Sequence, residues 1–262
     1  MPQHIIAIQG GGARAAFAAA VLSRLAQTEP PADMLVGTSG GALCAAGLAH
    51  RGWVGLRDLW MGINFRSDVW RTRWDFWNLK SALYDDTPLR KIIEGVAASP
   101  ALQPYTVCYS DLRTETPVYQ SHNQVGIGDA IRASCAIPWL VDPVNGYMVD
   151  GGLFECTPLA YCALHLPPEG GDITAILNQN RDVTNPSWTG TNVVETLLRS
   201  MDAMLNQTYS ADVKWCQTRP NIRLRVIEAP LTMQMSPLSF DHPSIVSAFN
   251  FGLTVKIPEF TA

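Results

Sequence analysis

The amino-acid sequence predicts a three-layer α/β fold with a mostly parallel central sheet. Short apolar runs alternate with helix-forming stretches along the chain, which is the pattern of parallel strands joined by crossover helices. The first two apolar runs each end in a glycine-rich turn that leads directly into a helical stretch. Because 262 residues that are 47% hydrophobic suffice for one complete core, we expect a single domain over residues 1–262.

The first strand and helix are joined by a loop of three glycines. Residues 5–8 are apolar and predict a buried parallel strand, and residues 15–27 predict a helix. Gly10, Gly11 and Gly12 lie between them, so successive backbone N–H groups are exposed where the positive end of the helix dipole lies. The loop is therefore expected to bind an anion.

The second strand and helix are joined by a turn that carries a serine. Residues 33–36 predict the strand and residues 42–50 the helix, with Gly37-Thr38-Ser39-Gly40-Gly41 between them. A strand, a sharp turn bearing a serine and a helix form a nucleophile elbow. Gly37 and Gly41 suit such a turn because strained backbone angles leave little room for side chains beside the serine. Ser39 is therefore a candidate nucleophile.

Two anions are compatible with the glycine loop, a nucleotide phosphate and the oxyanion of acyl transfer. Gly10, Gly12 and Ala15 nearly satisfy the dinucleotide fingerprint, which also calls for an acidic residue about twenty positions further on. The Ser39 turn stands at that second strand end instead. An oxyanion site explains both loops, since it brings the Gly11 and Gly12 N–H groups near the serine oxygen, where each donor is worth roughly 3 to 4 kcal/mol.

The rest of the chain is expected to complete the sheet and its helical layers. The predicted elements are a hairpin of residues 105–109 and 117–120, a helix over 128–134, a strand over 147–149, strands over 173–177 and 222–227, and a long helix over 193–214 between those last two strands.

A serine nucleophile needs a base, and the sequence offers a histidine and a carboxylate. His4, His50, His122 and His165 stand where surface residues are expected. His242 lies late enough in the chain to fit the Ser, Asp, His order of α/β-hydrolases. Asp150 ends a predicted strand and opens Asp150-Gly151-Gly152, where it is either a base or a turn aspartate bonded to its own backbone.

Taken together, four ordered motifs resemble those of the patatin-like phospholipases, over residues 5–158. They are Gly-Gly-Gly-x-Arg from Gly10 to Arg14, the serine turn from Gly37 to Gly41, Ala-Ser-x-Ala-Ile-Pro from Ala133 to Pro138, and the aspartate turn at Asp150. Two positions depart from the family pattern. Ala15 replaces a common glycine, and Cys156-Thr157-Pro158 replaces an Asn-x-Pro, so a supporting hydrogen bond is expected to be rebuilt.

The resemblance implies a patatin-like acyl hydrolase with a Ser-Asp dyad. Ser39 would be the nucleophile and Asp150 the base, while Gly10, Gly11, Gly12 and Gly40 would form the oxyanion hole. Arg14, Gly37, Gly41, Gly151 and Gly152 would support the site. The implied substrate is a phospholipid or another acyl lipid, with no cofactor and no metal. Acyl transfer or thioester hydrolysis on the same dyad, and a catalytically silent nucleotide-binding or scaffold module, are the alternatives.

Residues 52–90 form an aromatic-rich segment that holds five of the eight tryptophans. They are Trp53, Trp60, Trp70, Trp74 and Trp77, and Arg66, Arg71, Arg73 and Lys80 alternate with them. Indoles at headgroup depth and cations that meet lipid phosphates are typical of a membrane interface. The same residues also suit a cap packed over the core. We expect a cap, a membrane-facing segment, or a cap that is amphipathic on its outer side.

The amino-acid composition indicates which binding partners and which cellular compartment are expected. A net charge of −4 argues against nucleic acid, which calls for a basic face. The six cysteines form no C-x-x-C pair, so reduced thiols are expected rather than disulfides or a zinc site. The N-terminal residues do not resemble a signal peptide, and no apolar stretch is long enough to span a bilayer. The expected location is cytoplasmic, with peripheral membrane contact.

Overall fold

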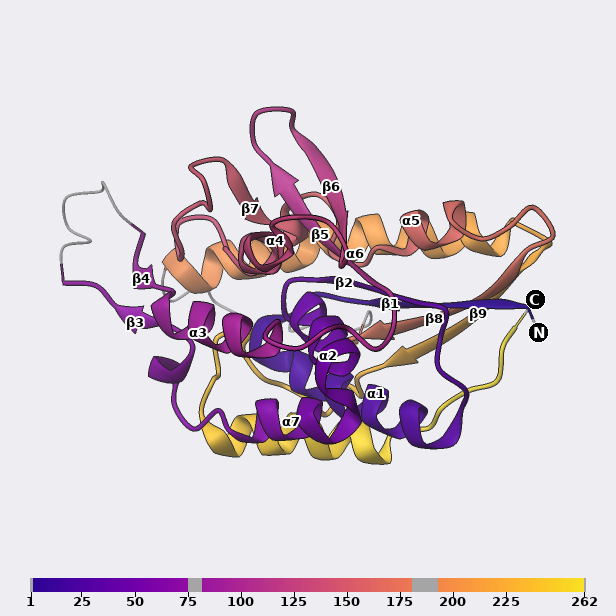
Figure 1. Ribbon diagram of the computed structural model, residues 1–262, viewed down its shortest axis with the longest axis horizontal. Helices are drawn as coiled ribbons and strands as arrows, with labels where there is room; N and C mark the ends of the chain where they lie inside the picture. The colour runs from indigo at the N-terminus through magenta and orange to yellow at the C-terminus, as the bar shows by residue number, and fades with distance from the viewer. Residues whose placement is uncertain (1, 75–81, 181–192, 262) are drawn as a thin grey trace.

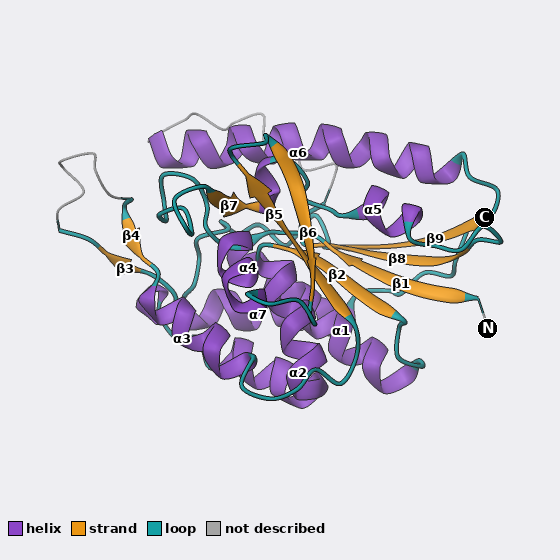
Figure 2. Cartoon of the chain, turned by 45° about the horizontal axis from the view of Figure 1, so that its top comes forward, coloured by secondary structure: helices purple, strands orange, loops and turns teal. Residues whose placement is uncertain are grey.

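The computed structural model describes residues 2–74, 82–180 and 193–261 (Figure 1). Within these residues, a seven-stranded, mostly parallel sheet lies between two layers of helices, as the ribbon drawings show (Figure 2). The predicted three-layer α/β fold is confirmed.

The sheet has the strand order β6-β5-β2-β1-β8-β9, with β7 paired to β5. The pairs β5–β2, β2–β1, β1–β8 and β8–β9 are parallel, whereas β6 and β7 run antiparallel to β5. The predicted hairpin is therefore confirmed as β5–β6. The strands are β1 (Gln3–Ile8), β2 (Met34–Thr38), β5 (Tyr105–Asp111), β6 (Thr116–Ser121), β7 (Met148–Asp150), β8 (Gly171–Leu177) and β9 (Ile222–Glu228).

The helices divide between the two faces of this sheet. Helices α1, α2 and α7 cover one face and α5 and α6 the other, while a two-stranded sheet of β3 and β4 projects beside α3 (Figures 1 and 2). The elements are α1 (Ala16–Thr28), α2 (Gly40–Met61), α3 (Thr87–Val96), α4 (Ile127–Ser134), α5 (Leu159–Leu164), α6 (Val193–Gln217), α7 (His242–Thr254), β3 (Arg71–Thr72) and β4 (Tyr84–Asp85), with short 3-10 helices at η1 (Gly12–Ala15), η2 (Arg66–Asp68) and η4 (Gly151–Leu153).

Strand β1 shows why both faces need a helical layer. Its side chains alternate, so Ile6 and Ile8 pack into the core beneath α1 and α2, whereas Ile5 and Ala7 pack into the second core with α5 and α6. Every one of these four side chains is buried. A strand with both faces buried reads as a continuous apolar run, which is how residues 5–8 appear in the sequence.

Helix α2 is longer than the helix expected over residues 42–50, and it contains a reversal. It runs from Gly40 to Met61, but Gly52 has φ 65° and ψ −177°, so two helical arms meet there at a non-helical residue. A positive φ of this kind is accessible to glycine at little cost. The second arm packs against the first, since a Cβ on Gly47 would lie 3.0 Å from Leu56 Cδ1, and Trp60 near its end lines the same cavity as Gly40 and Leu43 of the first arm.

The aromatic segment of residues 52–90 is neither wholly core nor wholly surface. Trp60 and Trp70 are buried, Trp53 is half-buried, and the side chain of Trp74 is 95% exposed. Trp77 and Lys80 lie outside the described residues. No helix among the residues that the structure describes combines the length and apolar character needed to cross a membrane.

Helices α1 and α7 approach closely at Gly252, and this contact yields a prediction. A Cβ atom at position 252 would lie 2.4 Å from the Phe17 carbonyl oxygen and 2.7 Å from the Ala20 Cβ. We expect Gly252→Ala to lower the free energy of unfolding by about 1–3 kcal/mol, because overpacking forces the two helices apart. Urea denaturation measures the change.

Gly128→Ala in α4 is the matched control, because a Cβ there meets no atom within 4 Å. It should leave stability unchanged or raise it by up to about 1 kcal/mol through helix propensity. Equal effects of the two substitutions would contradict a packing role for Gly252.

Candidate active site

Ser39 occupies a strained turn between β2 and α2. Its backbone has φ 54° and ψ −128°, and it directly precedes the first residue of the helix, Gly40. A non-glycine residue with positive φ is uncommon and costs of order 1–3 kcal/mol. Gly37 has no room for a side chain, because a Cβ there would lie 2.3 Å from the Gly41 carbonyl oxygen. This packing holds the serine at the carboxyl end of β2.

The side chains of Ser39 and Asp150 meet across the two strand ends. The Ser39 hydroxyl donates to Asp150 Oδ2 at 2.7 Å, and the Gly152 N–H donates to Asp150 Oδ1 at 2.7 Å. Asp150 is only 3% exposed, and this burial raises its pKa to about 7, although the hydrogen bonds from Ser39 and Gly152 oppose the shift. The carboxyl group therefore changes its protonation state near neutral pH.

Ser134, at the end of α4, supports the strained turn. The Ser39 N–H donates to Ser134 Oγ at 2.7 Å, and the Ser134 hydroxyl donates to the Cys108 carbonyl oxygen at 2.6 Å. The turn is thereby tied to β5, the strand that also pairs with β7 and Asp150. Ser134 belongs to the Ala-Ser-x-Ala-Ile-Pro motif, whose position in the sequence gave no indication of this contact.

The glycine loop after β1 lies against the serine turn. A Cβ built on Gly40 would lie 2.8 Å from the carbonyl oxygen of Gly12 and 3.4 Å from its nitrogen, so the two loops touch. The N–H groups of Gly11, Gly12 and Gly40 have no acceptor within the described part of the chain. The Gly10 N–H, by contrast, donates to the Cys156 carbonyl oxygen at 2.9 Å, so Gly10 fixes the loop rather than offering a donor to an oxyanion.

Side chains at the end of β8 hold the glycine loop in place. Asn178 Nδ2 donates to the carbonyl oxygen of Gln9 at 2.5 Å, and Asn178 Oδ1 accepts from the Ala18 N–H at 3.2 Å. The Arg14 guanidinium is buried and donates to Gln179 Oε1 at 2.6 Å. Sequence reasoning missed Asn178. Its position directly after a buried strand, at the carboxyl edge of the sheet, was the available signal.

The segment after Asp150 supports both loops through its backbone. The Thr38 hydroxyl donates to the Glu155 carbonyl oxygen at 3.0 Å, next to the bond from Gly10 to the Cys156 carbonyl. Gly151 packs against β5, where a Cβ would lie 2.3 Å from the Cys108 carbonyl oxygen. Cys156, which stands where the Asn-x-Pro pattern has asparagine, thus supplies a main-chain acceptor to the site.

The sequence model of the patatin-like phospholipase family matches residues 6–163. These residues contain the glycine loop, the serine turn and the aspartate turn, whereas Asn178 and Gln179 lie beyond them. The chain belongs to this family. It is a family of lipid acyl hydrolases, so the predicted resemblance is confirmed.

Among solved structures, VipD from Legionella pneumophila is similar, with a TM-score of 0.50 and 12% sequence identity. The alignment covers 96% of this chain and 65% of that chain, so the patatin-like chain described here spans about two thirds of its length. At this identity the likeness concerns the fold. None of the curated proteins matches the chain.

The histidines of this patatin-like chain lie apart from the dyad. His242 is exposed at the start of α7, with Nδ1 3.3 Å from the Ile63 carbonyl oxygen. His4 Nε2 lies 2.8 Å from Thr174 Oγ1 beneath the sheet. No histidine within the described ranges forms a hydrogen bond with Ser39 or Asp150.

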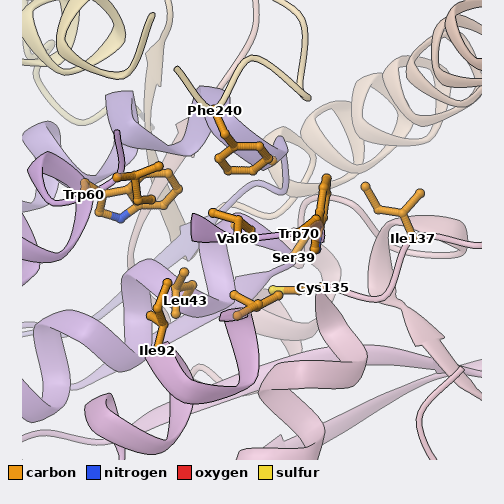
Figure 3. Close-up of a pocket in the computed structure, with 13 residues that line it drawn as sticks. Ser39, Leu43, Trp60, Val69, Trp70, Ile92, Cys135, Ile137 and Phe240 are labelled. Carbon is orange, nitrogen blue, oxygen red and sulfur yellow. The ribbon is translucent and has the colours of Figure 1, made fainter. Parts of the chain in front are cut away.

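Ser39 lies on the wall of an apolar cavity (Figure 3). Apart from the serine and two glycines of the loops, its walls are apolar or aromatic side chains and one thiol. The lining residues are Gly12, Ser39, Gly40, Leu43, Trp60, Ile63, Val69, Trp70, Leu89, Ile92, Cys135, Ile137 and Phe240.

The buried Asp150 carboxyl yields a prediction about stability and pH. Its native pKa of about 7 lies above the unfolded value of about 3.9, so folding favours the protonated form. The resulting stabilisation is complete below the unfolded pKa and is lost as pH rises through the native pKa. We expect the free energy of unfolding to decline between about pH 4 and pH 7, by roughly 1.4 kcal/mol per pH unit at most.

Asp150→Asn should make this decline less steep, because the amide does not titrate, whereas Glu155 and Asp212, whose pKa values burial also raises, keep their own contributions. Urea denaturation at a series of pH values measures both slopes, and Asp129→Asn, an exposed position on α4, controls for the loss of one carboxylate. Parallel slopes for the wild type and Asp150→Asn would show that the Asp150 carboxyl is not the buried titrating group.

Proposed function

We propose that this protein is a serine lipid acyl hydrolase of the phospholipase A or lysophospholipase type, with Ser39 as nucleophile and Asp150 as base. The observation that carries the proposal is the 2.7 Å hydrogen bond from the Ser39 hydroxyl to Asp150, on the wall of an apolar cavity. Membership of a family of lipid hydrolases supports the same chemistry.

In the first half of the reaction, Ser39 attacks the ester carbonyl carbon. The hydroxyl proton passes to Asp150 Oδ2, which it already contacts, and the carbonyl oxygen becomes an oxyanion. The Gly12 and Gly40 residues meet where the glycine loop touches the serine turn, at the positive end of α2, and their N–H groups with that of Gly11 are the donors in this proposal. Such donors are each worth about 3 to 4 kcal/mol to an oxyanion. Collapse of this intermediate returns the proton from Asp150 to the leaving alcohol and leaves an acyl group on Ser39.

In the second half, water takes the place of the alcohol. Asp150 accepts a proton from the water as it attacks the acyl-Ser39 carbonyl, and the same N–H groups again face the oxyanion. The proton then returns to Ser39 Oγ, and the fatty acid leaves. A carboxylate with a pKa of about 7 is suited to both steps, because it accepts and releases a proton near neutral pH.

The nucleophile and the base are tested by substitution. Ser39→Ala should abolish hydrolysis of p-nitrophenyl esters and labelling by a fluorophosphonate probe, since it removes the attacking oxygen. Asp150→Asn should lower kcat/KM at least about 100-fold, the lower bound for a positioned acid-base group. The wild-type kcat/KM should rise with pH through about 7 as the Asp150 carboxyl loses its proton.

His242→Ala is the matched control for a histidine triad, and it should leave turnover close to the wild-type value. A loss as large as that of Ser39→Ala in a folded protein would replace the dyad with a triad. Mass spectrometry of products from mixed lipids separates hydrolysis from acyl transfer, because only hydrolysis releases free fatty acid.

The aromatic segment further supports peripheral contact with a membrane. Beside the cavity, backbone hydrogen bonds join three chain segments into a small ribbon. The Arg73 N–H donates to the Leu83 carbonyl oxygen, and the Leu83 N–H donates to the Trp139 carbonyl oxygen. Trp74 and Trp139, which is 71% exposed, lie on this ribbon, and the exposed Arg71 belongs to it. Exposed indoles beside a cation match the headgroup region of an anionic bilayer. We term Arg71, Trp74 and Trp139 the interfacial patch.

Binding to vesicles of phosphatidylcholine and phosphatidylglycerol tests the interfacial patch. Trp74→Ala should weaken binding roughly tenfold or more, because an indole that leaves water contributes more than 1.4 kcal/mol, while hydrolysis of a soluble ester is spared. Leu164→Ala, an exposed apolar position on α5, is the control that should leave binding unchanged. Wild-type vesicle binding by Trp74→Ala would remove the patch from the proposal.

A further inference from the structure

The reversal of α2 at Gly52 folds this helix into two arms that pack against each other. A Cβ built on Gly47, in the first arm, would lie 3.0 Å from Leu56 Cδ1 in the second, so the arms are in contact at this level. Four residues further from the reversal on each arm stand Leu43 and Trp60, and both line the cavity. Leu43 lies about one helical turn after Ser39, and Trp60 lines the same side of the cavity as Leu43 (Figure 3).

Trp60 forms the side of the cavity opposite Ile137. It is the largest of the fully buried side chains, with 1% of its surface exposed. Figure 3 shows Trp60 with Leu43 and Ile92 on one side of the cavity, whereas Ile137 lies on the other side, beyond Ser39. An acyl chain that has its carbonyl at Ser39 and extends along this apolar lining, away from Ile137, would reach the indole.

From this arrangement we propose that Trp60 determines acyl-chain length, admitting chains of short to medium length and excluding long ones. The proposal rests on the proposed acyl hydrolase function and deepens it by naming the acyl group that the site takes. A methylene that fits an apolar pocket changes kcat/KM about 10-fold or more relative to one that does not. For acyl chains up to the length that reaches the indole, each added methylene should raise kcat/KM. A longer chain must either displace the packed Trp60 side chain or leave its end in water.

The test compares p-nitrophenyl butanoate, octanoate and palmitate. The wild type should prefer octanoate to palmitate, and Trp60→Leu should raise the ratio of kcat/KM for palmitate to that for octanoate at least about tenfold, because the smaller side chain lengthens the cavity. Trp53→Leu is the matched control. It makes the same change in the same arm at a half-buried residue that is not part of the cavity lining, and it should retain the wild-type ratio.

Trp60→Phe is the second variant, to be used if Trp60→Leu does not fold. It keeps an aromatic ring in the core, and it should also raise the palmitate-to-octanoate ratio. Displacement of a fluorescent fatty acid from Ser39→Ala by octanoate and palmitate reports the same selectivity without turnover. An unchanged palmitate-to-octanoate ratio in the folded Trp60 variants overturns the assignment. Absence of ester hydrolysis by the wild type, with octanoate still displacing the probe better than palmitate, would instead overturn the hydrolase function and leave the chain-length assignment standing.

Discussion

The strained backbone of Ser39 is the constraint on which the rest of the site depends. A serine with positive φ stays in place only because its surroundings leave it no other position. Gly37 and Gly41 allow the turn to close on itself, and Ser134 Oγ accepts from the Ser39 N–H, which would otherwise be buried without a partner. The same turn begins α2, so the strained nucleophile lies at the N-terminal, positive end of this helix.

The burial that positions Asp150 also determines its chemistry. An exposed aspartate would be fully ionised at neutral pH and would be a poor acceptor for a serine proton. Enclosure between β5 and the glycine turn weakens the solvation of the charged form, and two hydrogen bonds keep the oxygens oriented. A carboxyl group in these surroundings meets, without an imidazole, the requirement for a base that both takes and returns a proton.

Much of this arrangement was predictable, because it is encoded in contiguous residues. The glycine loop, the serine turn and the aspartate turn each combine a strand end with glycines, and their order identified the family. The contacts of Asn178 and Ser134 were not predictable, since they reach segments 169 and 95 residues away. The strand end before Asn178 and the motif around Ser134 mark the two residues but do not indicate their partners. The reversal at Gly52 was missed because both arms of α2 carry apolar residues with helical spacing, and only the backbone shows that the direction changes.

The backbone bonds from Thr38 to the Glu155 carbonyl and from Gly10 to the Cys156 carbonyl have a consequence for biosynthesis. The nucleophile and the glycine loop lie in the first 40 or so residues, but their base and their shared support arrive more than a hundred residues later. A growing chain that has exposed Ser39 thus has neither a proton acceptor nor a settled loop geometry. On the proposed mechanism, reactivity begins only when the segment after β7 docks, so synthesis of the chain itself delays the onset of lipid cleavage.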